Sequence, residues 1–151
     1  MTDQVTVERF IPAPAAAIFD LLADPSRHHE LDGSGHVQLP KSTPARLTNG
    51  SSFRMAMRMG VPYSMVSTVI EFDEGRRIAW QTRGPTAIGR YVGGRIWRYD
   101  LEPEDGGTMV RETWDISQES LLTRPMVRTA AAQTKKDMEA TLATIERIVT
   151  A

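Results

Sequence analysis

Glu112 is the carboxylate best placed for chemistry, because it stands between Val110 and Trp114 on one face of an alternating, strand-like segment. A carboxylate buried on such a face needs a partner, or it carries a raised pKa that suits general acid catalysis. Arg95 and Tyr99 share a face of the preceding predicted strand and are positioned to supply that partner. We predict that Arg95, Tyr99 and Glu112 fix the polar end of a ligand and are the catalytic candidates if the chain is an enzyme. A solvated cross-strand ion pair is the alternative interpretation.

Aromatic side chains share this presumed inner face. Trp97 and Tyr99 alternate on one predicted strand, and Trp80 occupies a similar position on an earlier strand. A face built from Trp, Tyr and Glu packs less readily than one of Val, Ile and Leu, and it suits a ligand pocket with a few polar groups. Large core aromatics beneath a helix are the alternative.

Methionine recurs on a further strand face, where Phe53, Met55 and Met57 alternate and Met65 lies just beyond the next turn. Its flexible side chain suits a surface that accepts varied apolar shapes, and it equally fills gaps in ordinary cores. The ligand-contacting residues predicted from all these patterns are Phe53, Met55, Met57, Met65, Trp80, Trp97, Tyr99, Glu112, Trp114, Met126 and Ala130.

Two other groups of residues bear on metal and cofactor chemistry, and a third pattern bears on hydrolase chemistry. The histidines and acids between residues 28 and 36 lack the i, i+4 histidine pair of metalloprotease helices, so a solvated helix cap and loop, or the rim of a cavity, is predicted there. The glycines of residues 84–94 do not lead from a parallel strand into a helix, which argues against a dinucleotide cradle. No Gly-x-Ser-x-Gly nucleophile motif occurs. We therefore predict no metal and no cofactor.

Length and composition narrow the class of protein. The 151 residues predict a single domain over residues 1–151, and the absence of cysteine excludes a disulfide scaffold, a thiolate zinc site and a cysteine nucleophile. A net charge of −1 provides no field for a polyanion, so nucleic acid is not a predicted partner. No apolar run of about eighteen residues and no secretory signal occur, so we expect a cytoplasmic chain without stable membrane insertion.

The elements that must position these residues are mostly strands. After a first strand at 5–11, runs of strand length separated by Gly-containing turns are typical of an antiparallel meander. Its predicted strands are 36–39, 52–59, 63–72, 77–82, 94–101 and 108–116.

Two short helices are predicted after the first strand, at 15–23 and 26–31, and one long helix follows residue 117. An apolar stripe with three- and four-residue spacing marks the face of the long helix that must cover the sheet. Its members are Leu122, Met126, Ala130, Thr134, Met138, Leu142, Ile145 and Val149. The order of elements predicts an α+β fold in which a curved six- or seven-stranded antiparallel sheet grips one helix.

This order of elements, together with several local motifs, resembles the START-like helix-grip (SRPBCC) superfamily and its bacterial polyketide cyclase/dehydrase and lipid-transport branch. The resemblance is carried by the first strand and helix (residues 7–25), by the segment 27–35, and by Leu101-Glu102-Pro103 before Gly107-Thr108. It covers essentially the whole chain. What it implies is a cavity between the concave sheet face and the long helix.

The function predicted from the residues and the resemblance is binding or transport of a hydrophobic small molecule, such as a lipid, a polyketide-like compound or an aromatic metabolite. One alternative is a cyclase/dehydrase-type enzyme in which Glu112, with Tyr99 or Arg95, promotes enolisation and loss of water. A second is a protein-interaction module without a small ligand. The chain is expected to be a monomer or a homodimer.

Overall fold

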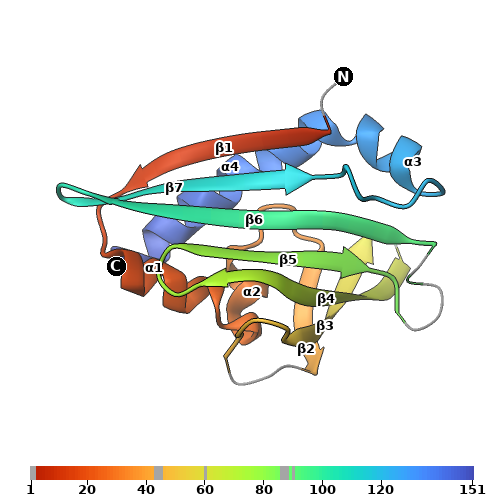
Figure 1. Cartoon of the computed structure of the whole chain (residues 1–151), viewed down its shortest axis with the longest axis horizontal. Coiled ribbons are helices and arrows are strands. Elements are labelled where there is room, and N and C mark those ends of the chain that lie inside the picture. Colours follow the sequence, from red (N-terminus) through yellow and green to blue (C-terminus); the bar gives the residue numbers. More distant parts are fainter. Residues whose placement is uncertain (1–2, 43–45, 60, 86–88, 90) are drawn as a thin grey trace.

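The fold is built on one antiparallel sheet of seven strands, which confirms the predicted six- or seven-stranded antiparallel sheet, and the strand order is β1-β7-β6-β5-β4-β3-β2 (Figure 1). The computed structural model describes residues 3–42, 46–59, 61–85, 89 and 91–151. Each strand from β2 to β6 pairs with the strand that follows it in the sequence, and β1 pairs with β7, so the sheet is a meander with its first strand added at the β7 edge. The strands are β1 (Gln4–Ile11), β2 (Val37–Ser42), β3 (Ser52–Met59), β4 (Val61–Asp73), β5 (Arg77–Arg83), β6 (Gly93–Glu104) and β7 (Gly107–Asp115).

The β6–β7 hairpin sets the register of the central strands. Its two-residue turn pairs Glu104 with Gly107, and this register places Tyr99 opposite Glu112. The same register places Trp97 opposite Trp114, two residues farther from the turn. Alternation then directs all four side chains to one face of the sheet.

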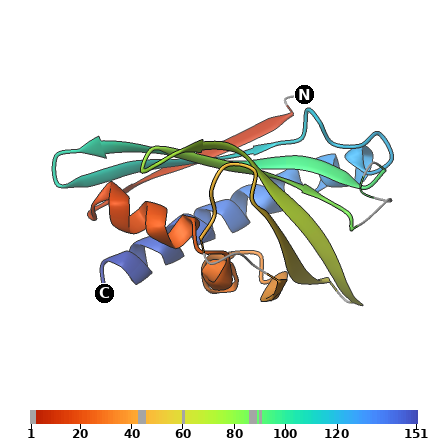
Figure 2. The same cartoon turned by 60° about the horizontal axis from the view of Figure 1, so that its bottom comes forward.

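Helices cover the concave face of the sheet, and α4 runs along the length of that face (Figure 2). Two short helical segments follow β1, as predicted: the first is α1, and the second begins as the 3-10 turn η1 and continues as α2. Asp24 caps η1 by accepting a hydrogen bond from the Ser26 backbone N–H. Buried apolar residues from α1, the inner strand faces and α4 form one core. The helical elements are α1 (Ala15–Leu22), η1 (Pro25–Arg27), α2 (His28–Leu31), α3 (Arg124–Thr129) and α4 (Ala131–Val149).

The long C-terminal helix is interrupted at Ala130, which ends α3 and begins α4 with φ −89° and ψ 1°. Beyond the break the predicted stripe is correct, since Met138, Leu142 and Ile145 are buried. Before the break it is wrong, because Val127 is buried and Met126 is exposed. Leu122 and Ala130 are exposed as well.

Arginines on the outer face of the sheet are neutralised by neighbouring acids. Arg98 donates two hydrogen bonds to Glu71, and Arg111 donates one to Glu8 across the β1–β7 pair. The outer sheet therefore presents paired charges and no basic surface at these positions.

The loop after α2 packs directly on α4 through Gly33. Its backbone N–H donates to the Thr141 hydroxyl at 2.8 Å, and a Cβ on Gly33 would lie 2.1 Å from the Asp137 carbonyl oxygen. We expect Gly33→Ala to lower the free energy of unfolding by about 2 kcal/mol or more, measured by urea denaturation, because backbone must move to admit the methyl group.

Gly35 provides the matched control in the same loop. It has φ +75°, and a Cβ there would meet no other atom. Gly35→Ala should therefore cost only the left-handed backbone penalty of about 1 kcal/mol. Equal losses for the two variants would show that the loop is not closely packed on α4.

Candidate functional site

The site is centred on a buried acid and phenol that face each other across β6 and β7. The Tyr99 hydroxyl donates a hydrogen bond of 2.9 Å to Glu112 Oε2, and both side chains are almost fully buried. The second carboxyl oxygen, Oε1, is buried and has no hydrogen-bond partner among the described residues. A buried oxygen without a partner is uncommon in folded proteins and identifies a position where a further polar group would be stabilised.

Burial controls the ionisation of this pair. Desolvation by burial raises the pKa of Glu112 to about 8, and the negative charge of Asp32 also raises it. The hydrogen bond from Tyr99 favours the charged form and opposes this rise. Burial also raises the pKa of Tyr99 well above its ordinary value, with Glu112 adding to the effect. Glu112 is therefore mostly protonated at neutral pH. Because Oε2 accepts from Tyr99, the carboxyl proton is available on Oε1 for donation to an acceptor.

An aromatic wall surrounds the pair. The Trp80 ring lies 5.6 Å from the Tyr99 ring and 5.8 Å from the ring of Phe53, measured between centroids. Trp97 and Trp114, which face each other across β6 and β7, have centroids 6.5 Å apart. These side chains confirm the parity predicted from sequence and form a largely apolar surface beside one polar pair.

His28 is the member of this wall that the sequence analysis placed elsewhere. It was expected in a solvated helix cap, but it is buried, stacks on Trp80 at 4.9 Å and donates from Nε2 to the Leu22 carbonyl oxygen at 2.8 Å. Burial lowers the pKa of His28, so the ring is held neutral. The spacing of His28 and Leu31, one turn apart and both buried, is the sequence signal that would have indicated an inward-facing histidine.

The predicted ligand-contacting residues divide by position. The core holds seven of them, Phe53, Met55, Met65, Trp80, Tyr99, Glu112 and Trp114, and Met57 and Trp97 are partly buried. Met126 and Ala130 are exposed at the break between α3 and α4, so the structure does not bring them to the site. The reason is that the predicted stripe advances by four residues per step, about 40° more than one turn of an α-helix, so it has left the buried face when it reaches Ala130 and Met126.

Arg95 is not the partner of Glu112. Its guanidinium forms two hydrogen bonds with the buried carboxylate of Glu119, at 3.2 and 2.9 Å. Arg95 lies four residues before Tyr99, roughly 13 Å along the strand, so it shares a face with Tyr99 without being near Glu112. Glu119, which the sequence analysis did not single out, also accepts from the Thr123 hydroxyl.

The segment after α2 contributes charge to the site but no metal centre. Asp32 accepts hydrogen bonds from the Ser34 hydroxyl and from the Val37 backbone N–H, and these contacts hold the loop in place. Its negative charge acts on both Glu112 and Tyr99. Within the described residues, no group of three or more His, Asp or Glu side chains is arranged to hold a metal ion.

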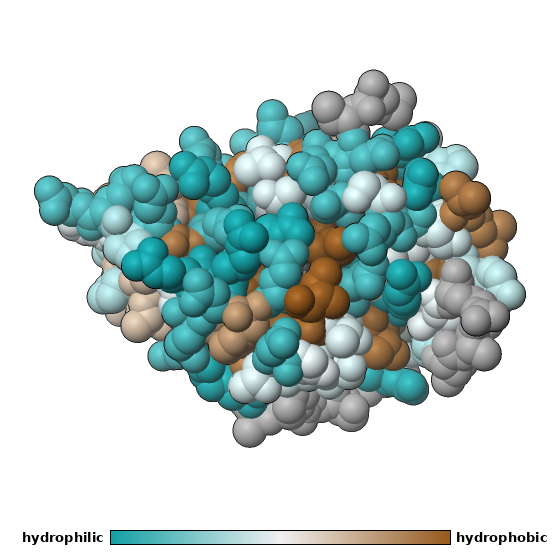
Figure 3. All heavy atoms as spheres, viewed as in Figure 1, coloured by the Kyte–Doolittle hydropathy of each residue, from teal (hydrophilic) through white to brown (hydrophobic). Residues whose placement is uncertain are grey.

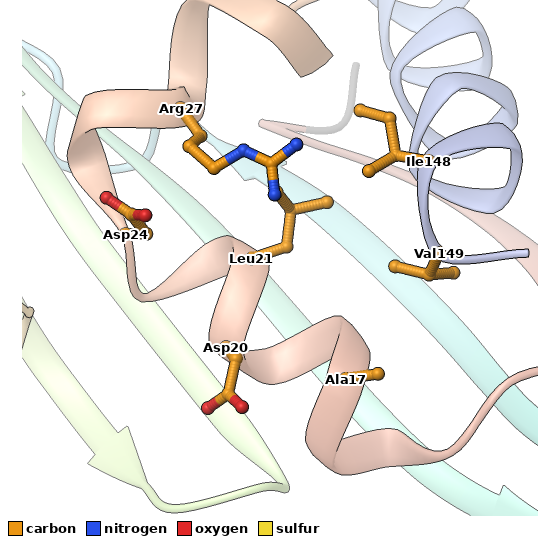
Figure 4. Close-up of a pocket in the computed structure, with 7 residues that line it drawn as sticks. All are labelled: Ala17, Asp20, Leu21, Asp24, Arg27, Ile148 and Val149. Carbon is orange, nitrogen blue, oxygen red and sulfur yellow. The ribbon is translucent and has the colours of Figure 1, made fainter. Parts of the chain in front are cut away.

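A pocket of about 300 Å³ opens between α1 and the C-terminal end of α4 (Figure 4). Arg27, Leu21 and Ala17 project toward Ile148 and Val149 across it, whereas the carboxylates of Asp20 and Asp24 point away from α4. None of the predicted ligand-contacting residues lines this pocket. The lining residues are Ala17, Asp20, Leu21, Asp24, Arg27, Ile148 and Val149.

A curved antiparallel sheet that grips a long C-terminal helix defines the helix-grip fold. Residues 2–150 match the family model for polyketide cyclase / dehydrase and lipid transport, and the chain belongs to this family. Family and fold together support a ligand-binding cavity in general.

Relatives confirm the fold over the whole chain. A Chromobacterium violaceum protein is 17% identical with a TM-score of 0.72 and covers 100% of this chain and 99% of its own. A Mycobacterium smegmatis protein is 16% identical, also with a TM-score of 0.72, over 99% and 92%. The Aha1 dimer from Colwellia psychrerythraea is 16% identical with a TM-score of 0.66, over 97% and 95%.

A relative in sequence is an uncharacterized protein of Mycobacterium tuberculosis, 36% identical over 107 residues. The alignment covers 70% of this chain and 44% of the relative, so the match spans less than half of that protein. Within the part of the chain that the structure describes, no helix is long and apolar enough to cross a membrane.

Proposed function

We propose that the chain binds an apolar or aromatic small molecule between the sheet and α4, with Glu112 and Tyr99 fixing its polar end. The observation that carries the proposal is the buried Glu112 Oε1, which has no partner among the described residues. A polar atom in this state is stabilised by a ligand that completes its hydrogen bonding. The aromatic wall of Trp80 and Trp114 and the buried Met55 and Met65 supply apolar contacts for the rest of the molecule.

The protonation state of Glu112 defines the chemistry of the ligand's polar end. With its pKa raised to about 8 by burial, the carboxyl group donates a hydrogen bond at neutral pH. It therefore suits a neutral acceptor, such as a ketone, ester or phenol oxygen. A ligand carboxylate is disfavoured, because a second negative charge would be desolvated close to Asp32 and Glu112.

The raised pKa of Glu112 also favours a second function, a cyclase/dehydrase-type reaction. A neutral acid near pH 7 is suited to general acid catalysis on a ketone oxygen, where it would promote enolisation and the later loss of water. Tyr99 would position the acid through its hydrogen bond. Arg95 has no part in this mechanism, since Glu119 holds it at the far end of the strand.

The first experiment is native mass spectrometry of the purified protein, followed by organic extraction and identification of any bound molecule. A stoichiometric apolar adduct is the expected result. Absence of an adduct, together with no change in Trp fluorescence on titration with aromatic ketones and long-chain esters, would contradict the proposal and favour a protein-interaction module.

Substitution of Glu112 then tests its role in binding. Glu112→Gln keeps a neutral donor, and we expect it to retain ligand affinity within about threefold. Glu112→Leu removes the polar group and should weaken binding about tenfold or more, with Glu104→Leu on the exposed β6–β7 hairpin as the matched control.

Turnover separates the two functions. A carrier releases its ligand unchanged, whereas an enzyme shows turnover that Glu112→Gln slows while binding is retained. Equal affinity of wild type and Glu112→Leu would show that Glu112 does not contact the ligand.

A further inference from the structure

The most exposed large apolar side chains gather at one end of the molecule. Leu121, Leu122 and Met126, in the loop before α3 and in α3 itself, are 81%, 72% and 64% exposed, and Tyr91 is 57% exposed. Ser120 joins the two segments, because its hydroxyl donates to the Tyr91 carbonyl oxygen at 2.7 Å. We call these four apolar residues, Tyr91, Leu121, Leu122 and Met126, the tip patch.

No comparable group is present on the rest of the described surface. The other exposed large apolar residues, Phe10, Tyr63 and Ile70, are each at or near 40% exposure. Phe10 lies on β1, and Tyr63 and Ile70 lie seven residues apart on β4, roughly 23 Å along the strand. The space-filling view shows apolar atoms projecting at the end of the molecule that carries α3 (Figure 3). Grouped side chains of this size, rather than scattered ones, mark an interaction surface.

The charge around the tip patch is basic. Residues 120–136 contain Arg124, Arg128, Lys135 and Lys136 and no acidic residue. Arg128 is paired with Asp3, but Lys135 and Lys136 are exposed in the second turn of α4. The neighbouring acid, Glu119, is buried and bound to Arg95, so its charge is already compensated. Residues 120–136 are thus net positive, although the whole chain carries a net charge of −1 and Asp137 follows Lys136 directly.

The geometry points to docking of the tip patch on an anionic lipid surface. Leucine and methionine side chains on a short helix and its loop suit burial at the boundary between headgroups and acyl chains, and tyrosine is favoured at that depth. Lysine and arginine beside them are attracted to anionic headgroups. A second copy of the chain is a less suitable occupant, because two basic patches would repel each other in an isologous contact. This inference concerns the surface alone and does not depend on the proposed function.

Vesicle cosedimentation tests the inference with the intact chain. Vesicles of phosphatidylglycerol and phosphatidylcholine in equal parts should bind the protein at least about tenfold more tightly than vesicles of phosphatidylcholine alone. Raising NaCl from about 0.1 to about 0.5 M should weaken the binding, because salt screens the headgroup attraction.

The variant Leu121→Ser/Leu122→Ser should lose about tenfold or more in affinity for the anionic vesicles. Phe10→Ser/Ile70→Ser, which removes exposed apolar residues outside the tip patch, should bind as wild type does.

Three results would overturn the inference. One is the absence of binding to anionic vesicles, and another is equal binding to both vesicle types. The third is a concentration-dependent dimer, seen by light scattering, that dissociates in Leu121→Ser/Leu122→Ser, which would make the tip patch an interface between copies. Because all four substituted residues are exposed, circular dichroism is expected to show native folding in both variants.

Discussion

Glu112→Gln should make the protein markedly more stable than wild type at pH 8 and nearly equal to it at pH 4.5. The cause is the buried carboxyl group, whose pKa burial raises from 4.5 to about 8. Below pH 4.5 the group is protonated in both the folded and the unfolded state, so it does not affect the balance between them. Glutamine is neutral at every pH and retains an oxygen that accepts from Tyr99.

The sign of the pH effect follows from proton linkage. Between pH 4.5 and pH 8 the unfolded chain loses this proton while the folded chain keeps it, so stability falls as the pH rises. Above pH 8 the folded chain ionises as well, and the loss levels off. At about 1.4 kcal/mol for each pH unit, the total loss in wild type approaches 5 kcal/mol as an upper limit.

Urea denaturation of both proteins at pH 5, 6, 7 and 8 measures the difference directly. Burial lowers the pKa of His28, which adds an opposite slope to both curves and cancels in the comparison. Glu71→Gln is the control, because the hydrogen bonds from Arg98 lower the pKa of Glu71 and its removal should leave the fall between pH 5 and 8 in place. Parallel curves for wild type and Glu112→Gln would contradict the assignment of a protonated Glu112.

The sheet could be predicted because its strands alternate and its turns carry Gly. In the β6–β7 hairpin the sequence also predicts the register: the turn at residues 105 and 106 fixes which residues pair, and this register places Glu112 beside Tyr99. The same register separates Arg95 from Glu112, since Ile96 pairs with Asp115, the last residue of β7, and Arg95 lies beyond that pair. Counting residues from the turn, in addition to strand parity, would have assigned it correctly.

The break at Ala130 could not be predicted from local sequence. The run Ala130-Ala131-Ala132 favours a continuous helix, and no Gly or Pro marks an interruption. Tertiary contacts determine it, because α3 follows a loop that is held on the start of β6. The buried residue before the break could be predicted, because at about 100° per residue Val127 lies about 20° from Met138 on a helical wheel and Met126 lies about 120° from it. Steps of four residues drift by about 40° each, so the predicted stripe reaches Met126, which is exposed, and misses Val127, which is buried.

Glu119 is the residue whose loss should most damage this end of the fold. Its carboxylate is fully buried and accepts from Arg95 Nε and Nη2 and from the Thr123 hydroxyl. The loop that contains it lies so close to β6 that a Cβ on Gly94 would be 2.3 Å from the Gln118 carbonyl oxygen. Removing the carboxylate leaves the Arg95 cation mostly buried and without its anionic partner.

We expect Glu119→Leu to lower the free energy of unfolding by about 3 to 5 kcal/mol, because removing one partner of a buried ion pair leaves the other charge uncompensated. Arg95→Met should cost a similar amount for the same reason. The double variant Arg95→Met/Glu119→Leu should be more stable than either single variant, since two apolar side chains of similar size leave no charge to desolvate. Urea denaturation of the four proteins at pH 7 gives the coupling energy.

The solvated pair of Arg9 and Glu146 provides the comparison, because its side chains are 43% and 31% exposed while the Glu119 side chain is fully buried. Water already stabilises both charges there, so Arg9→Met and Glu146→Leu should show almost no coupling. If the losses in free energy of unfolding caused by Arg95→Met and Glu119→Leu add up to the loss in the double variant, the ion pair does not hold the loop on β6. Strong coupling at Glu119 and none at Glu146 would establish that burial, and not the ion pair alone, determines the contribution of each contact.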